Sequence, residues 1–232
     1  MYFFFHFFTG LVLGYLVGGI LHDRRWIIPC AVGAIIPDLI DKVIGHVLFP
    51  VTIGYGRIYA HTLLASLLIL ALGIILWMRQ SDPGVFAFGL GLFSHGILDL
   101  MWKYPENWSY PFLGPFRGHL PPDYIFTLIL RELQNPFELI IAIILMIVLM
   151  SYFNRQTISR LVSGNRQILA SIGAGTAILL CILSGVIIGW GLTGHRLKEV
   201  GWTFPEELII GGIVIGLAAW CIWQWQMRLK KP

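Results

Sequence analysis

Charged side chains are scarce in this sequence. Only 12% of its 232 residues are Asp, Glu, Lys or Arg, while 57% are hydrophobic. Because soluble domains carry about 25% charged residues, this composition excludes an ordinary soluble protein. Apolar runs of about 20 residues recur, and each is long enough to cross the ~30 Å hydrocarbon core of a bilayer. We therefore predict an all-α, polytopic transmembrane helix bundle in the inner (cytoplasmic) membrane of the cell.

Cysteine pairs and linkers are missing as well. The three cysteines, Cys30, Cys181 and Cys221, lie in apolar stretches without CxxC spacing, so neither a disulfide framework nor a zinc knuckle is expected. The sequence has no low-complexity linker and no sustained repeat, which favours a single domain over residues 1–232. Since no basic segment precedes the first apolar run, we interpret that run as a membrane span and not as a cleaved signal.

The net charge of +4 is small for a chain of this length. We attribute it to loop charges that orient the spans, and we expect no nucleic-acid partner. If the first loop is cytoplasmic, nine of the 16 Lys and Arg residues lie on the cytoplasmic side. This bias favours an N-terminus outside and a C-terminus inside the cell. The sequence leaves the oligomeric state open.

The hydropathy pattern predicts about seven spans, near 3–21, 27–49, 59–78, 84–103, 137–153, 168–190 and 207–227. Six spans, with the fifth or seventh lying in the interface, is the alternative count. The segment 104–136 is rich in Pro, Trp and Tyr and contains a short apolar stretch, Tyr124 to Leu130. We expect it to cap the site as an interfacial or re-entrant helix. The domain would then comprise a motif-bearing core over 1–103, the capping segment, and C-terminal spans over 137–232.

Five polar residues of the predicted spans fall at a common depth. Chain direction alternates between spans, so the starts of spans one and three and the end of span four share a side of the membrane. These positions hold His6, His61, His95 and Asp99, and Asp38 lies midway through span two. Ionisable residues within spans are costly and mark functional sites. Imidazoles and carboxylates together predict a divalent transition metal, zinc or alternatively manganese, with one or two ions.

Further residues of the same side are candidates for other roles. Asp41 and Glu138 are candidate catalytic residues that orient or activate a water, and Arg57, Arg117 and His119 are candidates for substrate binding. Simpler interpretations exist for some of the five metal candidates. A single membrane His is more often a packing residue, Asp38 after Pro37 could cap a helix at a break, and Asp99 could pair with His95 or Lys103.

Four short motifs resemble those of a known family. The stretches Pro37–Asp41, Arg57–Leu63 and Ser94–Asp99, together with the early His6-x-x-x-Gly10, resemble the membrane-bound metal-dependent hydrolases, whose first-described bacterial member is associated with the LexA regulon. The likeness covers roughly residues 6–100. It implies a metal held by the five polar residues named above and a hydrolytic reaction.

The chain departs from the family pattern at several positions. Where the pattern often reads His-Arg-Gly-x-x-His-Ser, this chain has Gly56, Ile58 and Thr62 in place of the first His, the Gly and the Ser. Its acidic pair, Asp38 and Asp41, is separated by two residues where one is common. The residue order is also distantly similar to zinc-dependent phospholipases C and P1-type nucleases. Their further His and His-x-x-x-Glu are absent here, so the likeness implies phosphoester hydrolysis with one or two ions, not three.

The sequence thus predicts a membrane-embedded hydrolase that uses a metal-activated water on a lipid or lipid-linked substrate, in particular a phosphoester. A metal-ion or proton-handling transporter is the first alternative, since intramembrane Asp and His also build ion paths. A structural membrane protein, in which these residues join helices, is the second. Against transport, the five residues gather at one depth, and the two halves of the chain show no paired, broken-helix repeat.

Overall fold

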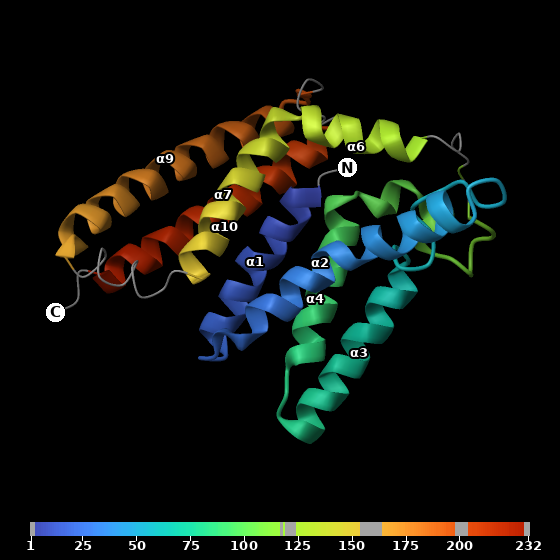
Figure 1. Cartoon of the computed structure of the whole chain (residues 1–232), viewed down its shortest axis with the longest axis horizontal. Coiled ribbons are helices and arrows are strands. Elements are labelled where there is room, and N and C mark those ends of the chain that lie inside the picture. Colours follow the sequence, from blue (N-terminus) through green and yellow to red (C-terminus); the bar gives the residue numbers. More distant parts are fainter. Residues whose placement is uncertain (1–2, 117, 119–123, 154–163, 198–203, 230–232) are drawn as a thin grey trace. The chain divides into compact units, whose positions relative to one another are not determined.

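The computed structural model describes residues 3–116, 118, 124–153, 164–197 and 204–229 (Figure 1). These residues form helices and connecting loops, which confirms the predicted all-α class. The chain divides into two compact units, Met1–Leu139 and Ile140–Pro232, and the division falls within one helix. The motif-bearing residues 1–103 lie wholly in the first unit.

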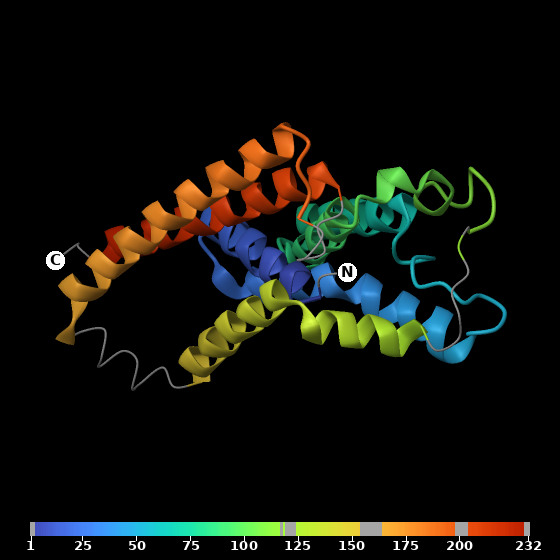
Figure 2. The same ribbon diagram turned by 90° about the horizontal axis from the view of Figure 1, so that it is seen from above.

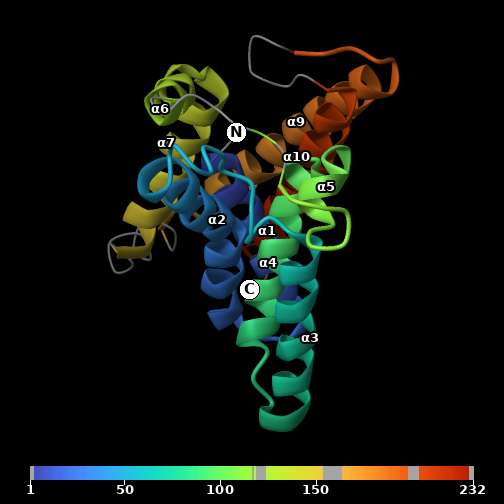
Figure 3. The same ribbon diagram turned by 90° about the vertical axis from the view of Figure 1, so that its right-hand side faces the viewer.

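Four helices form the centre of the first unit. They are α1 (Phe3–Ile20), α2 (Ile27–Lys42), α3 (Leu63–Gln80) and α4 (Gly84–Leu98). Helix α2 contacts both α1 and α4, and α3 packs beside α4, as Figure 3 shows. Short 3₁₀ turns, Arg24–Trp26 and Met101–Lys103, follow α1 and α4, and α2 continues as a π-helical segment, Val43–Leu48.

Small residues allow α2 and α4 to approach closely. A Cβ atom added to Gly33 of α2 would lie 2.0 Å from the Phe88 carbonyl oxygen, and one added to Gly91 of α4 would lie 2.0 Å from the Cys30 carbonyl oxygen. Any side chain at either position would displace the partner backbone. Close approach through small residues is the usual packing mode of membrane helices, and here it brings the ends of α2 and α4 together.

The helix ends near the motifs are set by local chemistry. Helix α3 begins after Thr62, whose hydroxyl accepts a hydrogen bond from the Ala65 N–H at 3.1 Å, as an N-cap does. Helix α4 ends before Asp99, because Leu100 adopts a left-handed conformation with φ 50°. His61 therefore lies just outside one helix and Asp99 just outside another.

The described part of the capping segment holds two helices. Helix α5 (Pro105–Trp108) is a single turn, and α6 (Tyr124–Gln134) leads into α7 (Pro136–Phe153). Asn135 separates α6 from α7, and its side chain accepts hydrogen bonds from the N–H groups of Phe137 and Glu138. An Asn followed by Pro ends one helix and caps the next.

The second unit is dominated by α9 (Arg166–Leu192) and α10 (Pro205–Leu229), which lie side by side along their length in Figure 2. The hydroxyl of Ser184 in α9 donates a hydrogen bond to the carbonyl of Gly212 in α10 at 2.8 Å. A Cβ added to Gly212 would lie 2.5 Å from the Ile188 side chain. Small residues and a hydroxyl therefore hold this pair together, as is common between membrane helices.

The predicted count of about seven spans is not confirmed. Among the described residues, four helices are long and apolar enough to cross a membrane: Phe3–Ile20, Leu63–Gln80, Gln167–Leu192 and Pro205–Met227. Two apolar helices, Gly84–Leu98 and Pro136–Met146, are shorter. The sequence overestimates the fourth span, because its apolar run continues past the point where Leu100 ends the helix. In the second predicted span, the regular α-helix has only 16 residues. Its last two turns contain the charged residues Asp38, Asp41 and Lys42.

Candidate metal centre

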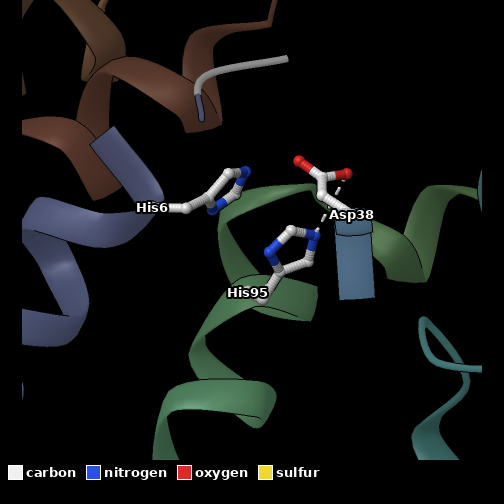
Figure 4. Close-up of side chains that lie close together, drawn as sticks. All are labelled: His6, Asp38 and His95. Carbon is white, nitrogen blue, oxygen red and sulfur yellow. Dashed lines mark ion pairs between the residues drawn. The ribbon is translucent and has the colours of Figure 1, made fainter. Parts of the chain in front are cut away.

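The structure brings together the five polar residues that the sequence singled out. All five are at least nine-tenths buried, and they come from α1, α2, α4, the C-cap of α4 and the residue before the N-cap of α3. Two overlapping groups have ligand atoms within 4.8 Å of one another: His6, Asp38 and His95, and His61, His95 and Asp99. Figure 4 shows the first group, with side chains from three helices pointing toward a common point.

Asp38 is not a helix cap. It follows Pro37 within α2, and the helix continues without a break to Lys42. Its side chain is 3% exposed. The Lys42 ammonium, one turn further along α2, lies against its Oδ1 atom. Lys42 was not among the residues predicted for the site, although its i, i+4 spacing from Asp38 indicates the pair.

The connection before α3 is held in place by Asp41. This carboxylate is fully buried and accepts hydrogen bonds from the N–H groups of Ile58, Ala60 and His61. It also contacts Nδ1 of His61 at 2.7 Å. Both of its oxygens are engaged, which places Asp41 to orient His61.

The two central histidines face each other through their Nε2 atoms. Nδ1 of His95 lies 2.7 Å from the carbonyl oxygen of Ala34, and Nδ1 of His61 lies 2.7 Å from Asp41. Since a carbonyl or carboxylate oxygen only accepts, these partners assign the proton of each neutral ring to Nδ1. The two Nε2 atoms lie 3.0 Å apart, a distance at which they share a proton when one ring is protonated and both offer lone pairs to a cation when both rings are neutral.

The carboxylates lie at similar distances from those nitrogens. Oδ1 of Asp38 is 3.6 Å from Nε2 of His61 and 3.8 Å from Nε2 of His95. Oδ2 of Asp99 is 3.8 Å and 4.0 Å from the same two atoms. Ligands at about 2.0–2.2 Å around a tetrahedral ion are separated by about 3.3–3.6 Å. The four side chains have donor types that suit a transition-metal ion, and their separations of 3.0 to 4.0 Å bracket this spacing.

His6 lies at the edge of this set. Its ring stacks on that of His95, with centroids 4.0 Å apart, and its Nε2 is 3.2 Å from Oδ1 of Asp99. If Nε2–H donates to that carboxylate, Nδ1 carries a lone pair, and this atom is buried without a hydrogen-bond partner among the described residues. His6 thus has a free donor atom for a metal.

Arg57 closes one side of the cluster. Its Nε–H donates to Oδ2 of Asp99 at 2.7 Å, and its guanidinium lies 5.1 Å from the centre of the Tyr104 ring. Burial opposes its charge, but the neighbouring Asp99 outweighs this and raises the pKa of Arg57 above its ordinary value. The side chain of Asn107 donates to the Arg57 carbonyl at 2.9 Å, so α5 fixes this connection. Arg57 retains 26% side-chain exposure, which leaves it accessible from outside the cluster.

The remaining candidates lie elsewhere. Glu138 is fully buried, and its Oε2 accepts a hydrogen bond from the Phe4 N–H at 2.8 Å, so it binds the N-terminus of α1. Among the described residues it forms no ion pair with the five cluster residues. Arg117 and His119 lie outside the described residues. The Ala34 carbonyl, in contrast, is a site group that no side-chain pattern indicates.

One protein family matches most of this chain. The YdjM inner membrane protein family matches residues 1–158. The chain belongs to this family. The match extends beyond the motif-bearing residues and includes α5, α6 and α7. It confirms the predicted integral membrane protein. A search of curated proteins and a search of solved structures found no match.

Proposed function

We propose that this protein is a membrane-embedded, metal-dependent hydrolase that acts on a lipid or lipid-linked phosphoester. The main support is the pair of Nε2 atoms of His61 and His95, 3.0 Å apart with both ring protons engaged behind them. With both rings neutral, two lone pairs at this distance repel each other, and a metal ion between or beside them would remove this repulsion. Metal-binding histidines characteristically donate their other N–H to a carboxylate or a backbone carbonyl, as these two do.

The charges around the pair also favour a cation. Asp38, Asp41 and Asp99 supply three negative charges, while Lys42 and Arg57 supply two positive ones. The neutral histidines leave one net negative charge in a buried region, where an unbalanced charge is costly. A bound cation would offset this negative charge, and the mixed imidazole and carboxylate donors suit a transition metal.

The roles follow from the contacts. Asp38, His61, His95 and Asp99 would hold the ion, and His6 would complete its ligands or hold a second ion. Zinc suits this mixed imidazole and carboxylate set, and manganese is the alternative. When bound, such an ion lowers the pKa of a coordinated water and polarises a phosphoryl oxygen.

The surrounding residues position these groups. Asp41 would keep His61 in the required tautomer, and the Ala34 carbonyl would do the same for His95. Arg57, which is partly exposed beside Asp99, would neutralise the phosphoryl charge of the substrate. Glu138 would hold the start of α1, and hence His6, in place. The cluster lies within a bundle of membrane helices, which favours a lipid or a lipid-linked compound as the substrate.

The test begins with metal content. The full chain, purified without chelator and placed in nanodiscs, should contain about one or two zinc or manganese ions by elemental analysis. Asp99→Asn should lose the metal and the hydrolysis of fluorescent phospholipids and aryl phosphodiesters, while its melting temperature without metal stays close to that of the parent. Asp82→Asn, on the exposed connection between α3 and α4, is the matched control and should change nothing.

The outcomes separate the competing functions. Background metal in a folded sample would overturn the proposal and favour a structural role for the polar cluster. In that role, the carboxamide of the Asp99→Asn variant would still form hydrogen bonds, each worth about 0.6 kcal/mol between membrane helices. Bound metal with no hydrolysis of any substrate, together with metal or proton flux in proteoliposomes, would favour the transporter.

A further inference from the structure

Helix α6 differs from the other long helices that the structure describes. The other long helices are apolar over most of their circumference, whereas α6 separates apolar from polar side chains. Phe126, Ile129, Leu130 and Leu133 follow the i, i+3, i+4, i+7 pattern of one helix face. Each of them is between 51% and 67% exposed. The structure buries no residue of α6 within the protein.

A second exposed face lies beside this apolar one. Thr127, Arg131 and Gln134 are exposed and lie on an adjoining side of the same helix. A third side, which includes Tyr124 and Leu128, is half-buried. An exposed helix with adjoining apolar and polar faces is typical of a helix that lies in the plane of the membrane–water interface.

Exposed apolar residues also follow α6 in the chain. Only Asn135 separates α6 from α7, and Leu139, the fourth residue of α7, is exposed. The chain belongs to a family of inner membrane proteins and has helices long and apolar enough to cross a membrane. Lipid is therefore the occupant that fits the exposed apolar face of α6.

Contacts with α1 fix the position of α6 along the bundle. The side chain of Glu132 in α6 accepts a hydrogen bond from the Phe3 N–H, at the first residue of α1. A carboxylate is favoured there, because the N-terminus of a helix carries a partial positive charge. His6 follows three residues later, which is about 4.5 Å along the helix axis. His6, the first residue of the polar cluster, therefore lies within one helical turn of the contact between Glu132 and Phe3.

We propose that α6 lies in the membrane–water interface, with its apolar face inserted among the lipids of the leaflet that holds the polar cluster. The protein then meets this leaflet at the depth of the glycerol and headgroup region. Given the proposed function, on which this last step rests, the bond that is cleaved lies at the same depth. The substrate class is therefore a lipid whose phosphoester is in the headgroup, and a bond within the acyl chains is excluded.

Depth measurements by electron paramagnetic resonance test the proposal without any enzymatic assay. Nitroxides are attached to single cysteines in a cysteine-free full chain in nanodiscs, and the accessibility to oxygen is compared with that to an aqueous nickel complex. Leu72, midway along α3, is the reference for the bilayer centre, and the exposed Arg25 is the reference for water. Leu130→Cys should show a ratio of oxygen to nickel accessibility between these references. Thr127→Cys, the matched control on the polar face, should resemble Arg25→Cys.

Three results would overturn the interfacial position. A label at residue 130 could be as accessible to nickel as Arg25→Cys, as deep as Leu72→Cys, or shielded from both reagents. The last would indicate a protein partner or a second copy of the chain.

A label at Tyr59, which is 50% exposed and two residues before His61, tests the depth of the cluster. The depth of this label should match the depth of the label at residue 130. A depth near that of the label at Leu72 would overturn the headgroup assignment but not the interfacial position of α6. Metal content, measured on the unlabelled parent chain in the same nanodiscs, tests the proposed function separately.

Discussion

His61 and His95 face each other through their Nε2 atoms at 3.0 Å, and each ring is held from behind by a hydrogen-bond acceptor. The acceptor behind His95 is a backbone carbonyl of α2, which side-chain mutation cannot remove. The acceptor behind His61 is the carboxylate of Asp41, which a side-chain mutation can remove. A mutation of Asp41 can therefore test how the orientation of the two histidines is fixed.

Asp41→Asn should weaken metal binding without removing a ligand. The carboxylate of Asp41 accepts hydrogen bonds from backbone N–H groups. In the Asn variant the amide nitrogen would face one or more of these donors, which would then lose their acceptor. Loss of such an outer partner costs about 10- to 100-fold in metal affinity, and an unsatisfied buried donor costs about 1–3 kcal/mol of stability. Zinc affinity, measured by competition with a fluorescent chelator, and the melting temperature should both fall. Unchanged affinity would show that Asp41 serves only the connection before α3.

Arg57 provides a test of substrate charge. Arg57→Met should lower kcat/KM for phosphoesters by about 10- to 100-fold, which corresponds to the 1.5–3 kcal/mol of a hydrogen bond to a charged group. Arg57→Lys keeps the charge but loses the planar contact with Tyr104 and the Nε bond to Asp99, so it should recover only part of the activity. Metal content should remain unchanged in both variants. If Arg57→Met retains full activity on anionic substrates, Arg57 serves only as the counterion of Asp99.

The close approach of α2 and α4 can be tested through glycine. Gly91→Ala would place a methyl group 2.0 Å from the Cys30 carbonyl oxygen, and overpacking of this kind costs about 1–3 kcal/mol or more. The variant should unfold at a lower temperature, and His95, one turn further along α4, should bind metal more weakly. Gly19→Ala in α1, where an added Cβ meets nothing within 4 Å, is the control and should leave the melting temperature unchanged. Equal melting of the two variants would contradict the packing of α2 against α4.

The sequence predicts the convergence of the five polar residues for a simple reason. Chain direction reverses at each short connection, so positions near the starts of odd spans and the ends of even spans share a level. His6, His61 and Asp99 follow this rule in the structure. The amphipathic stretch that begins at Tyr124 is also visible in the sequence, because its apolar residues recur with the helical period.

Other features depend on contacts that no local pattern encodes. The Ala34 carbonyl meets His95 only because two glycines let α2 and α4 touch. The role of Asp41 requires the connection before α3 to fold back onto α2, over a separation of 17 to 20 residues. Glu138 was assigned to catalysis from its level in the membrane alone, whereas its carboxylate binds the backbone of α1. The level of a residue along its helix can be read from the sequence, but the group that it meets on another element cannot.

The sidedness of the membrane can be determined from exposed residues of the first unit. Arg25 and Arg79 lie at the far end of the bundle from the polar cluster, while Val51 and Leu113 lie in connections at the cluster end. With single cysteines at these positions, an impermeant maleimide should label the first pair from one side of intact cells or inverted vesicles, and the second pair from the other. The predicted orientation requires Val51→Cys and Leu113→Cys to react from outside the cell. Labelling of all four positions from one side would contradict the arrangement of α1 to α4 as spans.

Removal of the metal should destabilise the protein by an amount that mass action sets. A ligand that binds only the folded state stabilises it by RT ln(1 + [L]/Kd), which is about 2.7 kcal/mol when the free ligand is at 100 times its Kd. Treatment of the parent protein with a chelator should therefore lower the melting temperature in nanodiscs, and excess zinc should restore it. Asp99→Asn should melt at the same temperature with and without chelator, because the lost carboxylate removes the charge that favours a divalent ion. Asp82→Asn should behave like the parent. If the chelator shifts Asp99→Asn as much as the parent, the stabilising ion binds outside the polar cluster, and the assignment of Asp99 as a ligand is wrong.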